Sequence, residues 1–550
     1  MSLLGRHVAV GLVLVAAAAR AQERVDLDAM NRIRDEGLNR SQVMTTLEEL
    51  VDRYGPRLTA SPEAKAAAEW AKTKLAGWGL QGARLEAFEY GQGWSFGKCA
   101  VRVTAPFSAP AFALPRAWTP GTHGPVHGPV AKVTFESDDD YTEQKGKLAG
   151  RVVFLSEARE PEAEDAAKPE TPLRRFARAE LDELSRYPIP AEKPRDWFSR
   201  AQKRFDDGEK INKFLAEEGA LAVVDRSFRD NGVVGVSAAG SRGLAGRSLG
   251  VPHVTMAAEP YQRILRLTEH GQPVELELDV ETQFFDDKRS YNVLAEIPGG
   301  DRKDEVVMIG AHLDAWHAST GTTDNGVGVA VVMEAARILE AAGLKPRRTV
   351  RVALWTGEEQ GEIGSNAYVH EHFADRPGSA DPAEAKYPLW LQHPGWPIRT
   401  KPEHANLAAY FNLDNGSGKV RGIYAQSNVA VMPIFSAWLE PLKDLGADTV
   451  VSQNTDATDH ESFDDVGLPG FQFIQDELDY ESRTHHTNLD TYEHAHRDDL
   501  IQAAVVLASF AWDAASRDQM LPRKAMPQAP PKPPEKPAEH KKPAKSGQAH

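Results

Sequence analysis

The second half of the chain alternates short apolar runs with longer amphipathic runs, which is the pattern of β-strands alternating with α-helices. The expected strands lie at 306–311, 349–355 and 405–413, and the expected helices at 327–342 and 500–515. Chains with this alternation form a mostly parallel sheet that is covered by helices. The sequence therefore predicts an α/β fold with a mostly parallel mixed sheet flanked by helices.

Side chains that bind metal ions follow these expected strands. Five short stretches carry them: His312-Leu-Asp314, Asp324-Asn325-Gly326, Glu358-Glu359, Asn412-Leu-Asp414 and His485-His486-Thr487. Three of the stretches come directly after an expected strand, and ligands in such sheets gather beyond the carboxyl ends of the strands. Two imidazoles, two aspartates and one glutamate suffice for a pair of hydrolytic metal ions, with one carboxylate left to move protons.

Each stretch also has an ordinary interpretation when it is taken alone. A lone His-x-Asp is more often structural, and Asp-Asn-Gly is a common turn or helix cap. Together the stretches favour a metal site in which His312 binds an ion and Asp314 orients its ring. Asp324 opens a helix and offers two carboxylate oxygens, one for each ion.

The remaining stretches extend this hypothesis. Consecutive side chains diverge in a turn, so Glu359 is expected to bind metal while Glu358 faces the attacking water as the general base. Asp414 follows an apolar strand, where a carboxylate is costly unless it is paired or metal-bound. Of His485 and His486, one is expected to bind, and the other to line the pocket or to be exposed.

Charge and cysteine content exclude several classes of protein. The net charge of −16 disfavours nucleic acid and anionic membrane surfaces as partners. Beyond the N-terminus, no run is apolar enough to span a membrane. Cys99 is the only cysteine, so no intrachain disulfide is expected even in an oxidising compartment. Nothing in the sequence indicates an oligomeric state.

Changes in composition divide the chain into five expected segments. Residues 1–21 are typical of a secretory signal peptide, with a basic start, a short apolar run and Ala-Arg-Ala at the cleavage site. Export to the periplasm or exterior of a bacterium is therefore expected. The main domain is expected to begin at 22–115 and to continue at 283–520, with a small β-rich domain inserted at 116–282. Residues 521–550 are expected to form a disordered Pro/Lys-rich tail.

The ordered motifs resemble those of the co-catalytic di-zinc aminopeptidase family. The order His-x-Asp, Asp-Asn-Gly, Gly-Glu-Glu, Leu-Asp and His-Thr-x-x-Asp-Thr is similar over residues 291–515, and residues 30–105 resemble the family's opening helices and strands. That family includes secreted bacterial aminopeptidases and relatives of plasma glutamate carboxypeptidase. The middle region resembles a protease-associated domain at 150–154, 219–224 and 251–254, although residues 156–210 exceed its usual length.

The resemblance implies a metal-binding role for five residues. Asp324 would bridge two zinc ions. One ion would be completed by His312 and Asp414, and the other by Glu359 and His486. The preference for His486 comes from the family ligand, which directly precedes a threonine.

The resemblance also implies roles beyond the ligands. Glu358 would be the general base. Asp459 and His460 resemble a family pair near the substrate pocket, where His485 is expected as well. His317 stands where relatives often have aspartate, and we expect it to alter the rim of the pocket.

These expectations describe a secreted zinc exopeptidase, an aminopeptidase that hydrolyses the N-terminal bond of a peptide substrate. Zinc suits imidazole plus carboxylate, with cobalt or manganese as substitutes. Dipeptidases and carboxypeptidases use the same scaffold, and no motif decides between them. A one-zinc glutaminyl cyclase or a receptor-like binding protein fits less well because the ligand set is complete.

Overall fold

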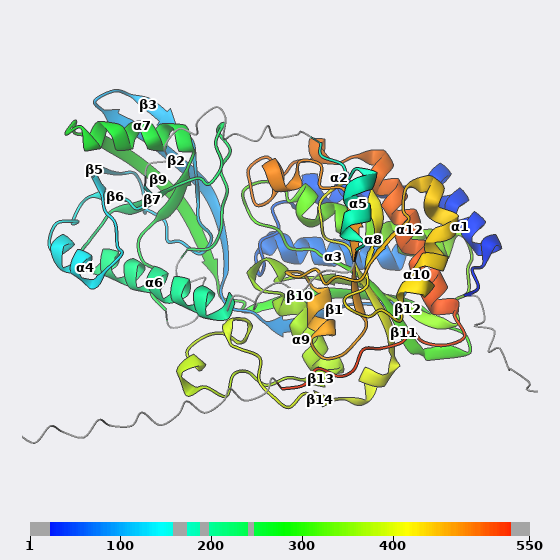
Figure 1. Cartoon of the computed structure of the whole chain (residues 1–550). Helices are drawn as coiled ribbons and strands as arrows, with labels where there is room; N and C mark the ends of the chain where they lie inside the picture. The colour runs from blue at the N-terminus through cyan, green and yellow to red at the C-terminus, as the bar shows by residue number, and fades with distance from the viewer. Residues whose placement is uncertain (1–22, 158–172, 187–196, 240–246, 530–550) are drawn as a thin grey trace, which may run out of the picture.

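The computed structural model describes residues 23–157, 173–186, 197–239 and 247–529. The described chain forms two parts that lie side by side, each built on an eight-stranded sheet (Figure 1). The expected signal peptide and residues 530–550 of the expected tail lie outside the described residues. None of the helices in the described ranges is long and apolar enough to cross a bilayer.

The first sheet is mixed, with parallel strands at its centre. Its spatial order is β1 (Gln81–Glu89), β10 (Arg289–Ile297), β12 (Arg348–Trp355), β11 (Arg302–His312), β15 (Leu407–Asn412), β18 (Gly470–Gln475), β16 (Val420–Tyr424) and β17 (Thr449–Val451). The strands β12, β11, β15 and β18 run parallel to one another. This arrangement confirms the predicted mixed sheet.

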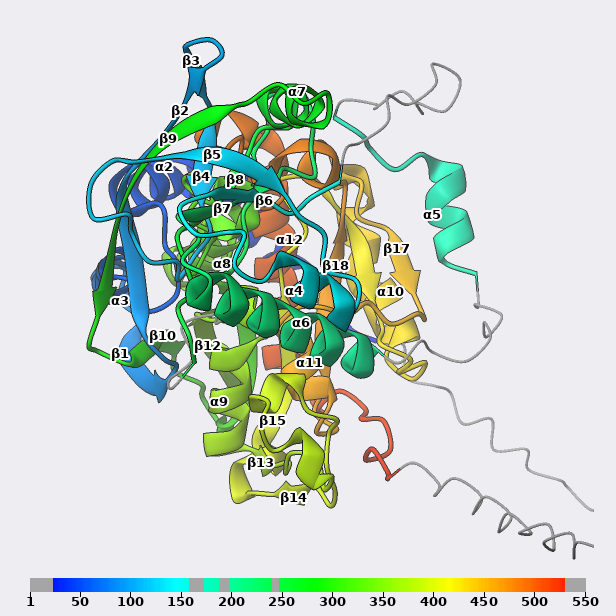
Figure 2. The same cartoon turned by 90° about the vertical axis from the view of Figure 1, so that its left-hand side faces the viewer.

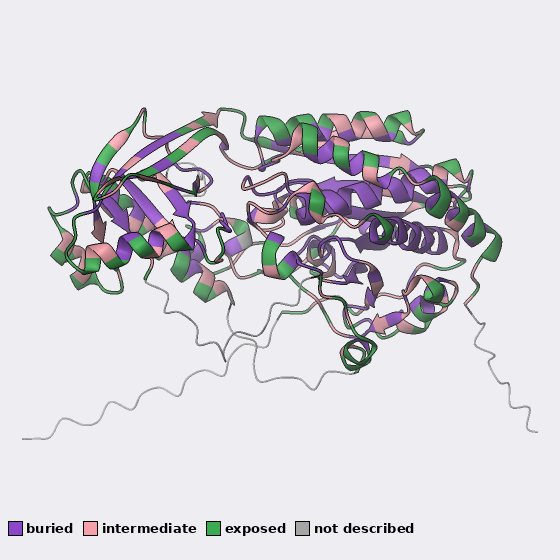
Figure 3. Cartoon of the chain, turned by 90° about the horizontal axis from the view of Figure 1, so that it is seen from above, coloured by how far each residue is buried: buried purple, intermediate pink, exposed green. Residues whose placement is uncertain are grey.

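Helices cover both faces of this sheet because its central strands are apolar on both sides. In β11, Val307 and Ile309 enter one core while Met308 enters the other. The first core is covered by α1 (Leu27–Arg40), α2 (Val43–Tyr54), α3 (Pro62–Gly77), α8 (Val327–Ala341), α10 (Met432–Leu439) and α12 (Arg497–Ser516). The second core is covered by α9 (Ile363–His372) and α11 (His460–Asp464). Helix α8 is buried almost throughout. Buried helices and strands gather in the interior of this part (Figure 3).

The second sheet has the order β3 (Ala109–Ala111), β2 (Gly93–Ala105), β9 (Glu275–Phe285), β5 (Val126–Lys132), β6 (Val152–Phe154), β7 (Ala222–Arg226), β8 (His253–Met256) and β4 (Ala113–Pro115). Helix α7 (Ala258–Glu269) covers one face, and α6 (Trp197–Glu217) covers the other (Figure 1). In β9 the alternate residues Leu276, Leu278 and Val280 are buried.

The chain enters the second sheet before the expected boundary at residue 116. Strand β2 pairs antiparallel with β9 from Gly93 opposite Phe285 onward, so residues 93–115 already contribute strands to the second sheet. The expected inserted domain stays a prediction.

The shorter elements connect these layers. They are α4 (Asp138–Gln144), α5 (Arg178–Leu184), β13 (Ala374–Asp375), β14 (Arg399–Thr400), η1 (Thr322–Gly326), η2 (Glu358–Gln360), η3 (Pro382–Glu384), η4 (Leu389–Leu391), η5 (Pro402–Asn406), η6 (Glu440–Leu445), η7 (Tyr480–Thr484) and η8 (Tyr492–His494). Helix α5 lies outside β17 (Figure 2), where Leu181 packs on Val451 and Ile474. The elements η1, η2 and η7 carry or adjoin the predicted metal ligands.

Candidate metal centre

Three of the predicted side chains lie at the carboxyl ends of the central parallel strands. His312 is the last residue of β11, Glu358 follows β12 by three residues, and Asp414 follows β15 by two. Strand β11 lies between β12 and β15 and runs parallel to both, with His312 opposite Trp355. The three strand ends therefore bring these side chains to one edge of the sheet.

His312 is surrounded by carboxylates. Its Nε2 atom lies 3.2 Å from Oδ1 of Asp414, 3.3 Å from Oδ1 of Asp324 and 3.9 Å from Oε2 of Glu358. Its Nδ1 atom lies 3.0 Å from the main-chain oxygen of Asp314, which can accept a hydrogen bond from it. With the proton on Nδ1, the Nε2 atom is free to bind a metal ion.

Asp324 faces a histidine on each side. It lies in η1, directly before α8. Its Oδ1 atom is 3.3 Å from Nε2 of His312, whereas its Oδ2 atom is 3.2 Å from Nε2 of His486. Oε2 of Glu359 lies 3.0 Å from the same nitrogen of His486. The two oxygens of the Asp324 carboxylate therefore face two separate groups of side chains.

The donor atoms fit zinc. Three sets of side chains bring ligand atoms within 4.8 Å of one another: His312 with Glu358 and Asp414, His312 with Asp324 and Glu359, and Asp324 with His485 and His486. Oδ2 of Asp324, despite its 3.2 Å approach to His486, and Oε1 of Glu359 are buried and accept no hydrogen bond of suitable geometry, which is costly for a carboxylate oxygen. A cation would satisfy both atoms, and imidazole with carboxylate is a ligand set that suits zinc.

Burial and charge shift the pKa values of these groups. Burial raises the pKa of Glu358 well above its usual range. Burial disfavours the imidazolium of His312, but the charges of Asp414 and Glu358 outweigh it and raise the His312 pKa well above its usual value. Burial likewise opposes ionisation of Asp324, yet contacts with His312 and His486 lower its pKa well below its usual range. Protons or cations must therefore balance this surplus of carboxylates.

Asp314 organises the turn that carries the two glutamates. Its carboxylate accepts hydrogen bonds from the main-chain N–H groups of Glu358 and Glu359, at 3.4 and 3.3 Å. It also accepts one from Oγ1 of Thr59 at 2.7 Å, and the same Thr59 oxygen accepts from the N–H of Gly357 at 3.1 Å. Thr59 therefore ties Asp314 to the start of this turn, and nothing in the local sequence marks it for that role.

Arg57 is a second supporting residue that sequence reasoning missed. Its buried guanidinium donates to the main-chain oxygens of Leu313, Thr320 and Gly321, each at 2.7 Å. These carbonyls belong to the loop that joins β11 to η1. Burial lowers the pKa of Arg57 to about 10, so the side chain stays charged at neutral pH.

Asp490 holds the main chain at Asp324 in place through hydrogen bonds. Its Oδ1 atom accepts from the N–H and Oγ1 of Thr323 at 2.5 and 2.7 Å, and its Oδ2 atom accepts from the N–H of Asp324 at 3.1 Å. Burial raises the pKa of Asp490 to about 7. The aspartate of the His-Thr-x-x-Asp-Thr motif, Asp490, therefore links the segment after η7 to η1, which carries Asp324.

The three residues expected at the substrate pocket lie in different settings. Asp459 is fully buried, and burial raises its pKa to about 8. His460 is buried with its Nε2 atom 3.1 Å from the main-chain oxygen of Thr455, and burial lowers its pKa to about 4. His485 is partly exposed, and its Nε2 atom lies 3.8 Å from Oδ2 of Asp324. Their roles toward substrate stay predictions.

His317 is buried, which corrects the expectation that it shapes the rim of the pocket. Its Nε2 atom lies 2.7 Å from the main-chain oxygen of Pro115, at the end of β4. Its ring packs edge-on against Trp94 and Phe96, with centroid distances of 5.0 and 5.5 Å. His317 therefore joins the loop after β11 to the second sheet.

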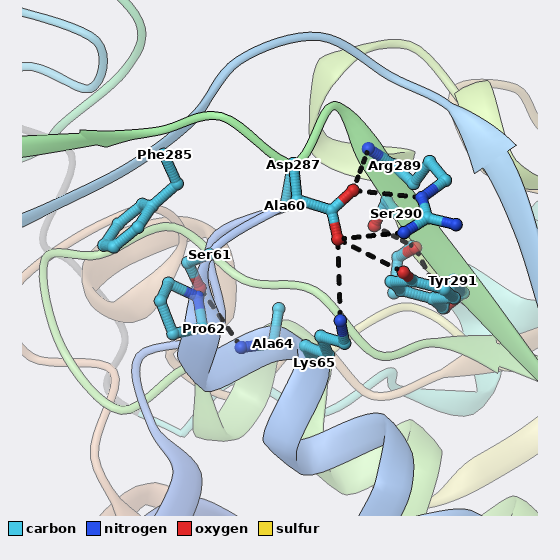
Figure 4. A pocket seen from close by; sticks show the side chains of 11 residues that line it. Ala60, Ser61, Pro62, Ala64, Lys65, Phe285, Asp287, Arg289, Ser290 and Tyr291 are labelled. Atoms are coloured by element: carbon cyan, nitrogen blue, oxygen red, sulfur yellow. Dashed lines mark hydrogen bonds and ion pairs between the residues drawn. The ribbon is translucent and has the colours of Figure 1, made fainter.

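A cavity of about 210 Å³ lies between the start of α3, the end of β9 and the start of β10 (Figure 4). Asp287 on its wall faces Lys65 and Arg289, at 3.5 and 3.0 Å. None of the side chains in the three ligand sets lines this cavity, so it is separate from the metal centre.

The chain is similar to known peptidases in sequence and in fold. Residues 292–511 match the model of Peptidase family M28. Carboxypeptidase Q of Bos taurus is 26% identical over 481 residues, which cover 86% of this chain and 85% of that protein. A Peptidase M28 precursor from Shewanella amazonensis SB2B has a TM-score of 0.64 at 24% identity, covering 91% of this chain and 99% of that chain. BSAP, a zinc aminopeptidase from Bacillus subtilis, has a TM-score of 0.55 at 17% identity, covering 86% and 95%.

Proposed function

We propose that this chain, which belongs to peptidase family M28 through residues 292–511, is a di-zinc exopeptidase of the aminopeptidase type. The observation that carries the proposal is the position of Asp324, whose two carboxylate oxygens face His312 and His486. A carboxylate that lies between two histidines could bind one zinc ion through each of its oxygens.

The ligands divide into two groups around Asp324. His312 and Asp414 would hold one ion, because their side chains approach each other on the Oδ1 side of Asp324. His486 and Glu359 would hold the other on the Oδ2 side. We assign His486 rather than His485 to this ion, because His485 is 3.8 Å from Oδ2 and His486 is 3.2 Å from it.

Zinc bound at these residues would acidify a water molecule and polarise the scissile carbonyl group. Glu358 accepts the proton from the attacking water and returns it to the amine that leaves. Burial raises the pKa of Glu358 in the absence of cations, and two bound zinc ions would lower it, so that the carboxylate could accept this proton. Asp314 and Thr59 fix the main chain of the turn, so the carboxylate of Glu358 stays aimed at the reacting atoms.

The surroundings of Glu358 suit the cationic α-amino group of a peptide substrate. Asp459 is a second carboxyl group close enough to act on Glu358, and burial raises the pKa of both. A cation docked there would offset their desolvation. This acidic environment supports cleavage at the amino end of the substrate. Export of the protein, expected from residues 1–21, is part of the same proposal.

A carboxypeptidase is the second candidate, and Arg229 is the observation that favours it. Its guanidinium donates to the main-chain oxygen of Glu481, whose carboxylate lies 3.7 Å from Nδ1 of His485. A cation at that position could receive the carboxylate of a substrate. The bovine relative is described as Carboxypeptidase Q, which is consistent with this alternative.

The first experiment tests the base and the metals together. We expect Glu358→Gln to retain two zinc ions per chain while kcat falls by about 1,000-fold, because proton transfer is lost. Glu340→Gln, in the last turn of α8, serves as the matched control and is expected to keep full activity. Wild-type turnover by Glu358→Gln would refute the assigned base, and fewer than two zinc ions in active wild-type protein would refute the di-zinc site.

The second experiment separates the two exopeptidase types. Dipeptides with a free amine and an amidated carboxyl end are compared with dipeptides that have an acetylated amine and a free carboxylate. We expect cleavage of the first group only. Cleavage of the second group, abolished by Arg229→Ala, would instead establish the carboxypeptidase.

A further inference from the structure

The main chain at His486 adopts a conformation that needs support. Its φ angle is +59°, in the left-handed region that residues with a side chain rarely occupy. Such a conformation persists only where neighbouring structure over-determines it. The same residue directs Nε2 toward Asp324 and Glu359, so this conformation decides where a metal ligand points.

The support comes from the second sheet, through a segment that we call the pairing segment, Val234–Val236. The N–H of Val236 donates to the main-chain oxygen of His486 at 3.0 Å. The N–H of Asn488 donates to the main-chain oxygen of Val234 at 3.1 Å, and Gly235 forms an antiparallel bridge with Thr487. The two hydrogen bonds thus bracket the ligand loop on both sides of Thr487.

One side chain completes this pairing. Oδ1 of Asn488 accepts a hydrogen bond from the N–H of Val234 at 2.6 Å. Asn488 therefore contacts Val234 through its main-chain N–H and through its side chain. It is two residues from His486 and is absent from the three ligand sets.

The pairing segment is itself anchored in the second sheet. The N–H of Gly235 donates to Oγ of the buried Ser227 at 3.1 Å, directly after β7. Val236 is buried in a cluster with Trp118 and Trp316, and the Trp316 ring lies 6.0 Å from the ring of His486. A displacement of the second sheet would therefore move the main chain of the ligand loop.

We propose that the pairing segment positions His486 for metal binding, with Asn488 as the positioning residue that locks the two loops together. This inference rests on the proposed function, because it takes His486 as a zinc ligand. It adds that the second sheet contributes to metal binding without supplying a ligand of its own.

The test compares variants at Asn488 by zinc affinity. Asn488→Ala removes the acceptor for the Val234 N–H, whereas Asn488→Asp keeps an acceptor oxygen. Asn39→Ala is the matched control, because Asn39 is an exposed residue of α1 whose side-chain amide donates to Asp35. Zinc content after dialysis against a graded chelator and the absorption spectrum of the cobalt-substituted protein are measured for each variant. Supporting contacts of metal ligands contribute about 10- to 100-fold to affinity.

We expect Asn488→Ala to bind one of its two zinc ions about 10- to 100-fold more weakly and to show an altered cobalt spectrum. We expect Asn488→Asp and Asn39→Ala to behave as wild type. Ser227→Ala removes the hydrogen bond that Gly235 donates to Ser227, and it is expected to weaken the binding of the same zinc ion. This variant tests the inference if Asn488→Ala fails to fold. Wild-type zinc affinity in both Asn488→Ala and Ser227→Ala would overturn the inference, as would loss of affinity in Asn488→Asp equal to that in Asn488→Ala. Wild-type protein without zinc would instead refute the proposed function.

Discussion

Replacing His317 by glutamine should remove a pH-dependent loss of stability. His317 is buried between Trp94 and Phe96 and donates to the main-chain oxygen of Pro115 at 2.7 Å. Burial lowers its pKa to about 4, because the imidazolium would lose its hydration there. A glutamine can keep a donor toward Pro115 but does not titrate, so the variant isolates the contribution of the charge.

The sign and size of the effect follow from the two pKa values. The unfolded chain has a histidine pKa near 6.5, so between about pH 6.5 and pH 4 it binds a proton that the folded chain excludes. The stability from neutral His317 is therefore complete above about pH 6.5 and decreases as the pH falls toward 4. The expected decrease between pH 7 and pH 5 is about 2 kcal/mol.

The assay is urea unfolding of metal-free protein at pH 5, 6 and 7, followed by tryptophan fluorescence. We expect wild type to lose about 2 kcal/mol more than His317→Gln between pH 7 and pH 5. His123→Gln, at an exposed position, serves as the control and should change in parallel with wild type. An equal pH dependence in wild type and His317→Gln would refute the assignment of His317 as a neutral interior histidine.

Two other predictions concern the support of the metal centre. Thr59→Val removes the hydrogen bonds to Asp314 and Gly357, and we expect kcat to fall by roughly 10- to 100-fold while Thr59→Ser retains activity. Steady-state kinetics with parallel zinc analysis measure this, and an unchanged kcat in Thr59→Val would contradict the role of Thr59. Removing zinc with a chelator should lower the melting temperature, since a ligand at 100 times its Kd contributes about 2.7 kcal/mol to the folded state. Differential scanning calorimetry before and after zinc is restored checks this, and a melting temperature that does not respond to zinc would contradict it.

The sequence predicts which candidate site residues follow the central strands, because strand ends are a local signal. His312, Glu358 and Asp414 follow apolar runs, and the parallel order of β12, β11 and β15 brings those ends together. The same reasoning identified the mixed sheet.

Contacts between distant segments could not be predicted in this way. Arg57 and Thr59 lie more than 250 residues before the loops that they support, and neither belongs to a recognisable pattern. The burial of His317 depends on Trp94 and Phe96 of β2, which lie more than 200 residues before it in the sequence. Strand β18 was not predicted either, although it completes the parallel centre beside β15.

The hydrogen bonds from Arg57 and from the Val234–Val236 segment have a practical consequence for protein engineering. The stretch 292–511 that matches the peptidase family does not include either of them. A fragment limited to that stretch would retain each proposed zinc ligand. It would lose the hydrogen bonds from Arg57 and from Val234–Val236 that hold the loops carrying these ligands. Chimeras that exchange the second sheet between relatives should consequently inherit zinc retention from the donor of that sheet.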